Sequence, residues 1–264
     1  MCIRDRLVGE IRSIEEELES VSSEYFTYQK DYYDSLKNYK CVITREELKD
    51  EIKDRNIIYL GDFHLSPECQ DNHLDIISYL KDISKETGKP PAIAVEFINS
   101  SYQKSVDRYL DGKIDENRLR LGTNYDRNFG FNYESYVRIL RYARDNNIPL
   151  YAADRPGGGS LNERDEYAAD RIADIYRKHG EEHQLVVIYG TYHVVPNHLP
   201  KMVKQRLPDV DQVSVVCEAP DIYWKTKIDG NKAVQVNDDI YFLPDTDEIT
   251  RAERYLDYLY EITS

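Results

Sequence analysis

The stretch NIIYLGDFHLSPE, residues 56–68, decides the fold class. A short run of aliphatic, β-branched and aromatic residues stops at an acid and a histidine, and Pro67 then stands where a helix would begin. A buried strand followed directly by a helix is the unit from which α/β proteins are built. The stretch therefore predicts an α/β protein, and it presents Asp62 and His64 at the carboxyl end of a strand.

The same alternation of strand and helix signals continues along the chain. Helical patterns separate the later apolar runs, and one of them, residues 160–180, begins with Ser160 and Glu163 in the spacing of a capping box. Strands separated by helices imply a mainly parallel sheet with helices on both faces. The further predicted strands are PPAIAVEF (90–97), IPLYAAD (148–154), QLVVIYGTYH (184–193) and QVSVVCEAP (212–220).

Both ends of the chain add to this domain. From Leu7 to about Asn38 apolar and aromatic residues recur three or four apart, which predicts an N-terminal helical arm over residues 1–38. Near the other end, the dipeptide Asp229-Gly230 between alternating runs predicts a β-hairpin, and a helix follows it. We expect the arm to offer a contact for a homo-oligomer and residues 39–264 to form one α/β domain.

Composition limits the function classes. The chain has 264 residues, a net charge of −14 and a pI near 4.9, so its overall field repels nucleic acid. No run approaches the ~18 consecutive apolar residues that a membrane span needs. The first residues, MCIRDR, resemble a translated sequencing-adapter remnant. The absence of a visible export signal therefore argues only weakly against an exported protein. As the sequence stands, the expected location is the cytoplasm.

The cysteines give no sign of a metal motif. Cys2, Cys41, Cys69 and Cys217 are far apart in sequence and form no CxxC pair. This spacing argues against a zinc knuckle and against a dense disulfide framework. We expect free thiols.

Polar side chains gather where the predicted strands end. In an open parallel sheet the carboxyl ends of the strands share one edge, and ligands bind in the crevice beyond it. The sequence therefore predicts a pocket for a small molecule or peptide, with Tyr192, Asp154 and Arg155 as ligand- or cofactor-binding residues. The residues at the strand ends are Asp62 and His64, Glu96, Asp154 and Arg155, Tyr192 and His193, and Glu218.

Two of the six histidines stand out. His64 and His193 each follow a strand and a glycine with two residues between, as GDFH and GTYH. The glycine allows close backbone approach while the imidazole turns back to the sheet edge. The other histidines are expected to be structural: His73, His179, His183 and His198.

Glu96 is expected to have a positively charged partner. It lies in AVEF among apolar neighbours, and a buried carboxylate is costly unless it is paired or binds a metal. The candidates are Arg155, Arg164 or a metal ion. For Arg164, on the helix after the third strand, we favour an inward ion pair slightly over a surface pair. The loop RPGGGS, residues 155–160, is weak as a nucleotide motif and reasonable as a mobile loop beside the cleft.

At these residues the sequence resembles the ChaN-like branch of the superfamily that also holds the Tiki and TraB proteins, with erythromycin esterases as more distant relatives. The resemblance runs from about Tyr39 to Ala219. It is carried by YLGDFH, AVEF followed by YQKSVDRYLDG, NIPLYAAD, NERDEYAADRI and VVIYGTYHVVPNHLP, in that order.

The resemblance implies a shared pocket of two Gly-x-x-His motifs and a strand-end glutamate, which are His64, His193 and Glu96 here. In Tiki-like members such a set serves metal-dependent peptide cleavage, in esterase-like members it activates water, and ChaN itself is associated with haem. Many members carry Glu after the first motif glycine, whereas this chain has the shorter Asp62. The haem-ligating residue of the family maps onto no particular tyrosine.

Three hypotheses follow. The first is a hydrolase of esters, amides or peptides in which His64, Glu96 and His193 hold a divalent transition metal, or in which a histidine acts as base with Asp62 or Glu96 orienting it and Arg164 in the site. The second is a haem-binding protein of iron uptake without catalysis. The third is a structural module whose polar cluster is an internal salt-bridge network.

Overall fold

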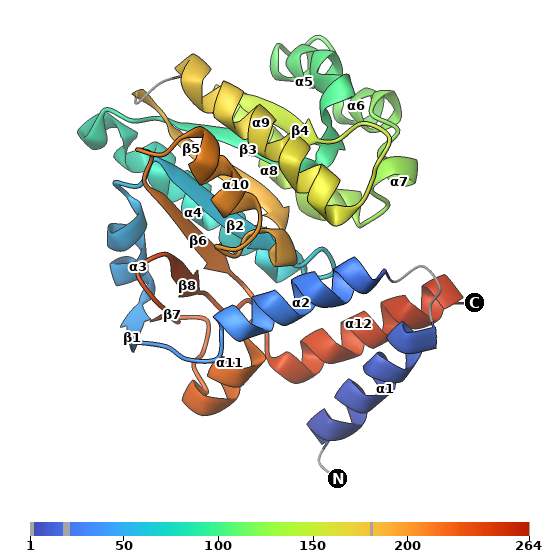
Figure 1. Cartoon of the computed structure of the whole chain (residues 1–264). Helices are drawn as coiled ribbons and strands as arrows, with labels where there is room; N and C mark the ends of the chain where they lie inside the picture. Colours follow the sequence, from blue (N-terminus) through green and yellow to red (C-terminus); the bar gives the residue numbers. More distant parts are fainter. Residues whose placement is uncertain (1–2, 18–21, 180–181, 264) are drawn as a thin grey trace.

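The computed structural model describes residues 3–17, 22–179 and 182–263, and its centre is a single sheet of eight strands (Figure 1). In sequence order the strands are β1 (Cys41–Thr44), β2 (Ile57–Asp62), β3 (Pro91–Asn99), β4 (Leu150–Asp154), β5 (Gln184–Gly190), β6 (Gln212–Val216), β7 (Lys232–Gln235) and β8 (Ile240–Phe242). In space their order is β1-β7-β8-β6-β2-β5-β3-β4.

The sheet is mainly parallel, as predicted. The strands β6, β2, β5, β3 and β4 pair in parallel, and β8 also joins β6 in parallel. Only the β1–β7 and β7–β8 pairs among the described residues are antiparallel. After β2 the chain builds β3 and β4 on one side, returns with β5 beside β2, and then crosses to β6 on the other side. The carboxyl ends of β2 and β5 thus mark the switch point at which a crevice opens.

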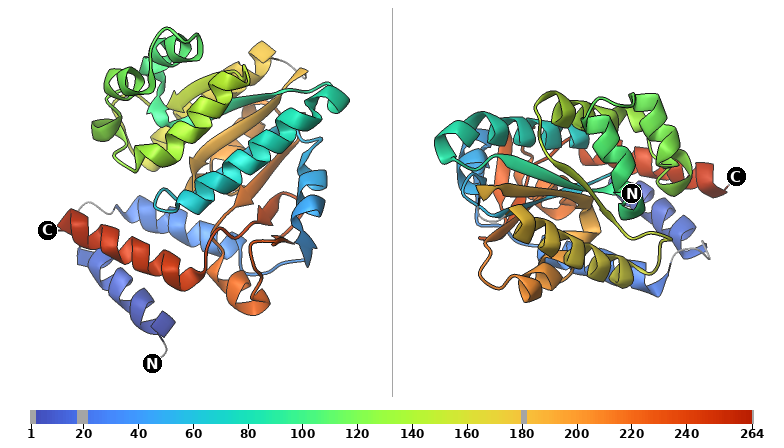
Figure 2. Two further views of the ribbon diagram at one scale, coloured as in Figure 1. Left: turned by 180° about the vertical axis from the view of Figure 1, so that it is seen from behind. Right: turned by 90° about the horizontal axis from the view of Figure 1, so that it is seen from above.

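Helices cover both faces of the sheet, as Figure 2 shows from above. Along the described chain they are α1 (Ile3–Glu17), α2 (Ser23–Ser35), α3 (Arg45–Ile52), α4 (Pro67–Thr87), α5 (Gln103–Leu110), α6 (Glu116–Gly122), α7 (Tyr125–Asn128), α8 (Tyr133–Asp145), α9 (Leu161–His179), α10 (Leu199–Arg206), α11 (Pro220–Thr226) and α12 (Glu248–Thr263), with 3₁₀ turns at Ser100–Tyr102 and Thr191–His193.

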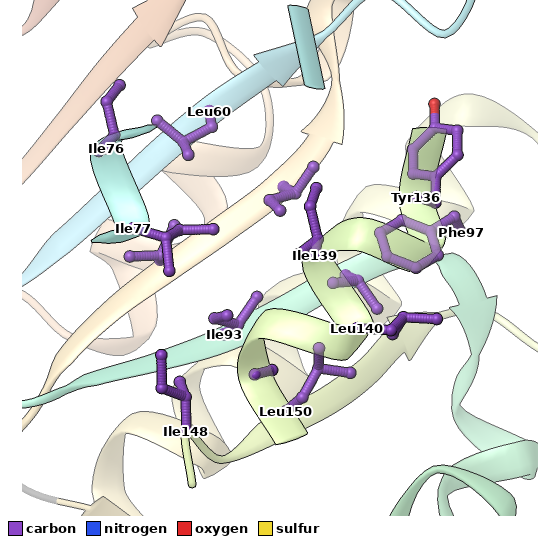
Figure 3. Close-up of a cluster of buried hydrophobic side chains, with 14 of the residues drawn as sticks. Leu60, Ile76, Ile77, Ile93, Phe97, Tyr136, Ile139, Leu140, Ile148 and Leu150 are labelled. Carbon is purple, nitrogen blue, oxygen red and sulfur yellow. The ribbon is translucent and has the colours of Figure 1, made fainter. Parts of the chain in front are cut away.

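The central strands bury both of their faces. On β2, Ile58 and Leu60 pack with α3 to α8, whereas Ile57 and Tyr59 pack with α2, α9, α10 and α11. Alternate side chains of a strand point to opposite faces, so a strand covered on both sides must be apolar throughout. Figure 3 shows the first of these cores, with Leu60 beside Ile76 of α4 and with Ile139 and Leu140 of α8 farther across the sheet.

The predicted helix starts are found. At α9 the capping box is formed, because Ser160 Oγ accepts from the Glu163 amide at 3.2 Å and Glu163 accepts from the Ser160 amide at 3.0 Å. At α4, Pro67 occupies the first turn, and Ser66 precedes it without a side-chain capping bond. The helix ends at Gly88, whose φ of 71° suits glycine.

The predicted hairpin exists, but its expected turn was wrong. Asp229 and Gly230 join α11 to β7, and the turn between β7 and β8 lies at residues 236–239. The reason is that Pro220 starts a helix whose Ile222 is fully buried, so the run before Asp229 is not a strand. The short edge strand β1 was not predicted.

The N-terminal stripe forms two helices. Figure 1 shows α1 beside α12 and α2 across the carboxyl edge of the sheet. The domain division at residue 38 and the oligomer contact remain predictions. Within the described part of the chain, the helices are all too short or too polar to cross a bilayer.

Candidate functional site

A cavity of about 870 Å³ opens at the carboxyl edge of the sheet, where the helices α1, α2, α11 and α12 close over it. The side chains of His64, Glu96, Arg164 and His193 line one part of it. The rest of its wall is largely apolar or aromatic and includes Leu7, Ile11, Phe26, Phe63, Phe131, Trp224, Tyr255 and Tyr258.

The first wall of the site is an aspartate–histidine pair from the end of β2. His64 Nδ1 lies 2.8 Å from Asp62 Oδ2. The same carboxylate accepts a hydrogen bond of 2.6 Å from the Tyr136 hydroxyl of α8 and one of 2.6 Å from Gln70 Nε2 of α4. Asp62 is thus buried and fully engaged, and it fixes the imidazole of His64 with Nε2 on the far side of the ring.

A second pair of the same kind follows β5. His193 Nδ1 lies 2.5 Å from Asp165 Oδ1 of α9, and the Tyr28 hydroxyl of α2 donates to Asp165 Oδ2 at 2.9 Å. Asp165 is completely buried. Each histidine is therefore the last member of a tyrosine–aspartate–histidine relay. The tyrosines of the two relays lie on different helices, Tyr136 on α8 and Tyr28 on α2.

Glu96 lies between the relays with a cation of its own. Arg164 Nη2 contacts Glu96 Oε1 at 2.5 Å, and the Gly190 amide donates to the other carboxylate oxygen. Arg164 is held in turn by Asp154 at 3.0 Å, which also accepts from the Tyr189 hydroxyl. The inward ion pair predicted for Arg164 is present.

The three groups meet at Gly190. A Cβ atom placed there would lie 3.2 Å from Glu96 Oε2, 3.4 Å from His193 Cδ2 and 3.5 Å from His64 Nε2. The glycine leaves this point clear, so a small reacting group has room among two imidazoles and a carboxylate.

The charges of the relays shift the titration of their members. Burial alone would lower the pKa of His64 and of His193, but the adjacent carboxylates Asp62 and Asp165 outweigh it and raise both above the ordinary 6.5. Burial raises the pKa of Asp62, and the neighbouring His64 more than reverses this and lowers it to about 2. Each relay thus favours a protonated imidazole beside a carboxylate.

Of the other predicted site residues, some line the cavity and others do not. Tyr192 and Glu218 line the cavity. Asp154 does not line the cavity but accepts a hydrogen bond from Arg164, which does. Arg155 is turned away and donates to the carbonyl oxygen of Gly158 in its own loop, so it does not line the cavity.

Three partners were missed by sequence reasoning. Asp165, Tyr28 and Tyr136 all lie on helices, where they fit a buried stripe. Asp165 directly follows Arg164 within NERDEYAADRI, one of the stretches that carry the family resemblance, and this was the signal for it.

The predicted metal ligands do not form a compact set. In the described ranges, the groups of three or more ligand atoms within 4.8 Å of one another do not include His64, Glu96 and His193. The oxygens of Glu96 are already used by Arg164 and the Gly190 amide. A metal in the cavity therefore remains a prediction, and the arrangement suits acid–base chemistry directly.

We expect Gly190→Ala to remove function without unfolding the protein. The backbone φ of −48° allows alanine, but the new methyl group occupies the point where the three side chains meet. Displacing a reacting group by about 1 Å can lower turnover roughly 10²-fold. Turnover and thermal melting of the variant test this. Gly122→Ala is the control, because its nearest contact would be an ordinary 3.6 Å. Unchanged turnover in Gly190→Ala would contradict the site.

Comparison with known proteins agrees with the sequence motifs. Residues 48–158 match the family described as haem-binding uptake, Tiki superfamily, ChaN. A comparison with curated proteins found no match.

Among solved structures, ChaN of Campylobacter jejuni, described with cofacially bound haem, aligns with a TM-score of 0.51 and 15% identity over 76% of this chain and 91% of that chain. The C-terminal region of Pasteurella multocida toxin, described with a thiol-protease-like triad, gives 0.41 and 14% over 70% and 26%. RRSP, a MARTX toxin effector domain from Vibrio vulnificus, gives 0.40 and 20% over 70% and 36%. In fold and in its matched segment, the chain resembles the ChaN family of the Tiki superfamily, as its motifs predicted.

Proposed function

We propose that the protein is a hydrolase that cleaves an ester or amide bond in an amphiphilic small molecule or peptide. The observation that carries the proposal is the convergence of two tyrosine–aspartate–histidine relays on the Glu96–Arg164 pair at one end of an apolar cavity. Ligand binding alone needs no pair of imidazoles that are each oriented by a buried carboxylate.

The chemistry follows from the bonds to the ring nitrogens. An aspartate that accepts from Nδ1 leaves Nε2 as the nitrogen that exchanges protons. One imidazole in its neutral form takes a proton from water, and the water oxygen attacks the carbonyl carbon. The second imidazole, protonated, gives its proton to the leaving oxygen or nitrogen as that bond breaks. Arg164 lies beside the developing negative charge, and Glu96 holds Arg164 and the Gly190 amide in place.

The cavity predicts the kind of substrate. Its aromatic and aliphatic wall would bury a long apolar group beside the relays. Each buried methylene contributes about 0.8 kcal/mol, or roughly fourfold in kcat/KM. In a series of p-nitrophenyl esters from acetate to decanoate, we expect kcat/KM to rise with chain length until the cavity is full. Activity that is absent, or highest for acetate, would contradict the proposed substrate class.

The rate is expected to depend on pH in a defined direction. The base must be neutral, and the pKa values of His64 and His193 are raised, so the rate should increase as pH rises through a midpoint above 6.5. Since both groups share one site, the midpoint belongs to the site as a whole. Asp165→Asn removes the carboxylate that raises the pKa of His193, and it should move the acidic limb to lower pH.

The matching control is Asp170→Asn, on the same helix, whose carboxylate contacts Arg206 at the surface. An acidic limb that stays in place in Asp165→Asn would show that His193 does not set it.

Haem binding is the second candidate, favoured by the family match over residues 48–158. The size and aromatic wall of the cavity suit a planar apolar ligand. Burial raises the pKa of the cavity tyrosines Tyr25, Tyr33 and Tyr192, which disfavours a tyrosinate ligand and leaves His64 or His193 to hold the iron. A stoichiometric Soret band that is lost in both histidine variants, in a protein inactive on the ester series, would select this function.

A further inference from the structure

A second group of chemically active side chains lies beneath the cavity. Cys69 is on the first turn of α4, Cys217 directly follows β6, and Asp245 lies between β8 and α12. The two sulfur atoms are only 2.8 Å apart, although 148 residues separate them in sequence. Both cysteines are buried free thiols. The proposed hydrolysis uses none of these three residues.

These side chains form a compact ligand set. One ligand atom from each of Cys69, Cys217 and Asp245 lies within 4.8 Å of the other two. Two thiolates with further nitrogen or oxygen ligands are the donors that zinc prefers at closed, buried sites. The sequence showed no such motif because the three residues come from separate crossovers of the sheet.

One buried polar atom of the cluster, Asp245 Oδ2, has no hydrogen-bond partner among the described residues, and the Asp245 side chain is 0% exposed. Buried polar atoms almost always have partners, so an unpartnered carboxylate oxygen beside two thiols favours a bound cation.

The charges also favour a divalent ion. Arg251 is buried, donates to Asp245, and lies 4.0 Å from Cys217 Sγ. Two thiolates and one carboxylate carry three negative charges. A divalent cation together with the guanidinium of Arg251 balances them, and the two thiol protons are released when the ion binds.

We propose that Cys69, Cys217 and Asp245 bind a zinc-type divalent ion. The ion ties the start of α4 to the end of β6 and to the segment before α12. These are three of the segments on which the cavity is built, and the site is structural because its donors are buried.

The test is metal analysis and cobalt spectroscopy on the full chain. Protein purified in the presence of Zn²⁺ should hold roughly one equivalent, as a structural zinc site does. Protein loaded with Co²⁺ should show a thiolate-to-cobalt charge-transfer band in the near ultraviolet. Both signals should be lost in Cys69→Ser and Cys217→Ser and be weakened in Asp245→Asn. Cys41→Ser is the matched control, since Cys41 is exposed on β1.

Three results would overturn the proposal. One is wild-type protein that shows no thiolate band with Co²⁺, a readout that needs no variant to fold. Another is a Cys69–Cys217 disulfide in the purified protein, with no metal uptake after reduction. The third is metal that persists in Cys217→Ser and is lost in His64→Ala, because the ion would then belong to the cavity. Ester hydrolysis is measured separately, so the two proposals fail independently.

Discussion

Replacing His64 or His193 by alanine is expected to lower kcat/KM for the best ester of the series by about 10²–10⁴-fold, the usual contribution of a positioned acid or base. Each imidazole is fixed by a buried carboxylate and faces the point above Gly190. Steady-state kinetics at a pH above the midpoint of the wild-type profile measure the loss. Circular dichroism checks that both variants stay folded.

The double variant makes the prediction sharper. If the two histidines act as donor and acceptor in one proton transfer, the double variant should be hardly slower than the worse single variant, because groups that act as a unit are not additive. His179→Ala is the control, since His179 lies at the end of α9 against Tyr151, away from the cavity. Losses that multiply, or variants that keep full activity, would contradict the paired mechanism.

Replacing Arg251 by methionine is expected to lower the free energy of unfolding by about 3–5 kcal/mol, the cost of leaving a buried charge without its partner. Arg251 is 3% exposed, donates to Asp245, and donates to the Cys217 carbonyl at 2.6 Å. Burial raises the pKa of the nearby Glu248 to about 8, so Glu248 is largely neutral at pH 7 and Asp245 loses its countercharge. Urea denaturation of metal-free protein measures the change, because a divalent ion at Asp245 would supply a second countercharge.

Arg254→Met, one turn along the same helix, is the matched control. Arg254 pairs with Glu68 at 2.6 Å, but their side chains are 31% and 45% exposed. An exposed pair contributes only about 0–1 kcal/mol. Equal effects of the two substitutions would show that burial of Arg251 does not determine its role.

The central strands were predictable because their signal is local. In β2 and β5 every residue is buried, and such strands read as continuous apolar runs. The edge of the sheet lacks this signal. Most of β1 is exposed, and its apolar run, Cys41 to Ile43, is only three residues long. The turn of the hairpin was misplaced because Asp229-Gly230 also suits the end of a helix, and only tertiary packing decides between the two.

The candidate site was predictable only in part, for a related reason. His64, Glu96 and His193 follow strands, and parallel strands bring their ends to one edge whatever the loops do. The partners that were missed lie on helices. Tyr28 meets Asp165 across 137 residues, and nothing in the local sequence distinguishes this tyrosine from one that only fills a core. The Cys69–Cys217 pair was missed in the same way.

The placement of α2 sets an order of events during synthesis. Tyr28 leaves the ribosome early, but its acceptor Asp165 is made 137 residues later. The acceptor of Tyr32, the carbonyl oxygen of Glu218, is made 186 residues after Tyr32. At about 5–20 residues per second, α2 waits several seconds or more for the surface it covers. The orientation of His193 is therefore among the last features to form, and a chain whose synthesis stalls within α9 would lack β5, His193 and the second relay.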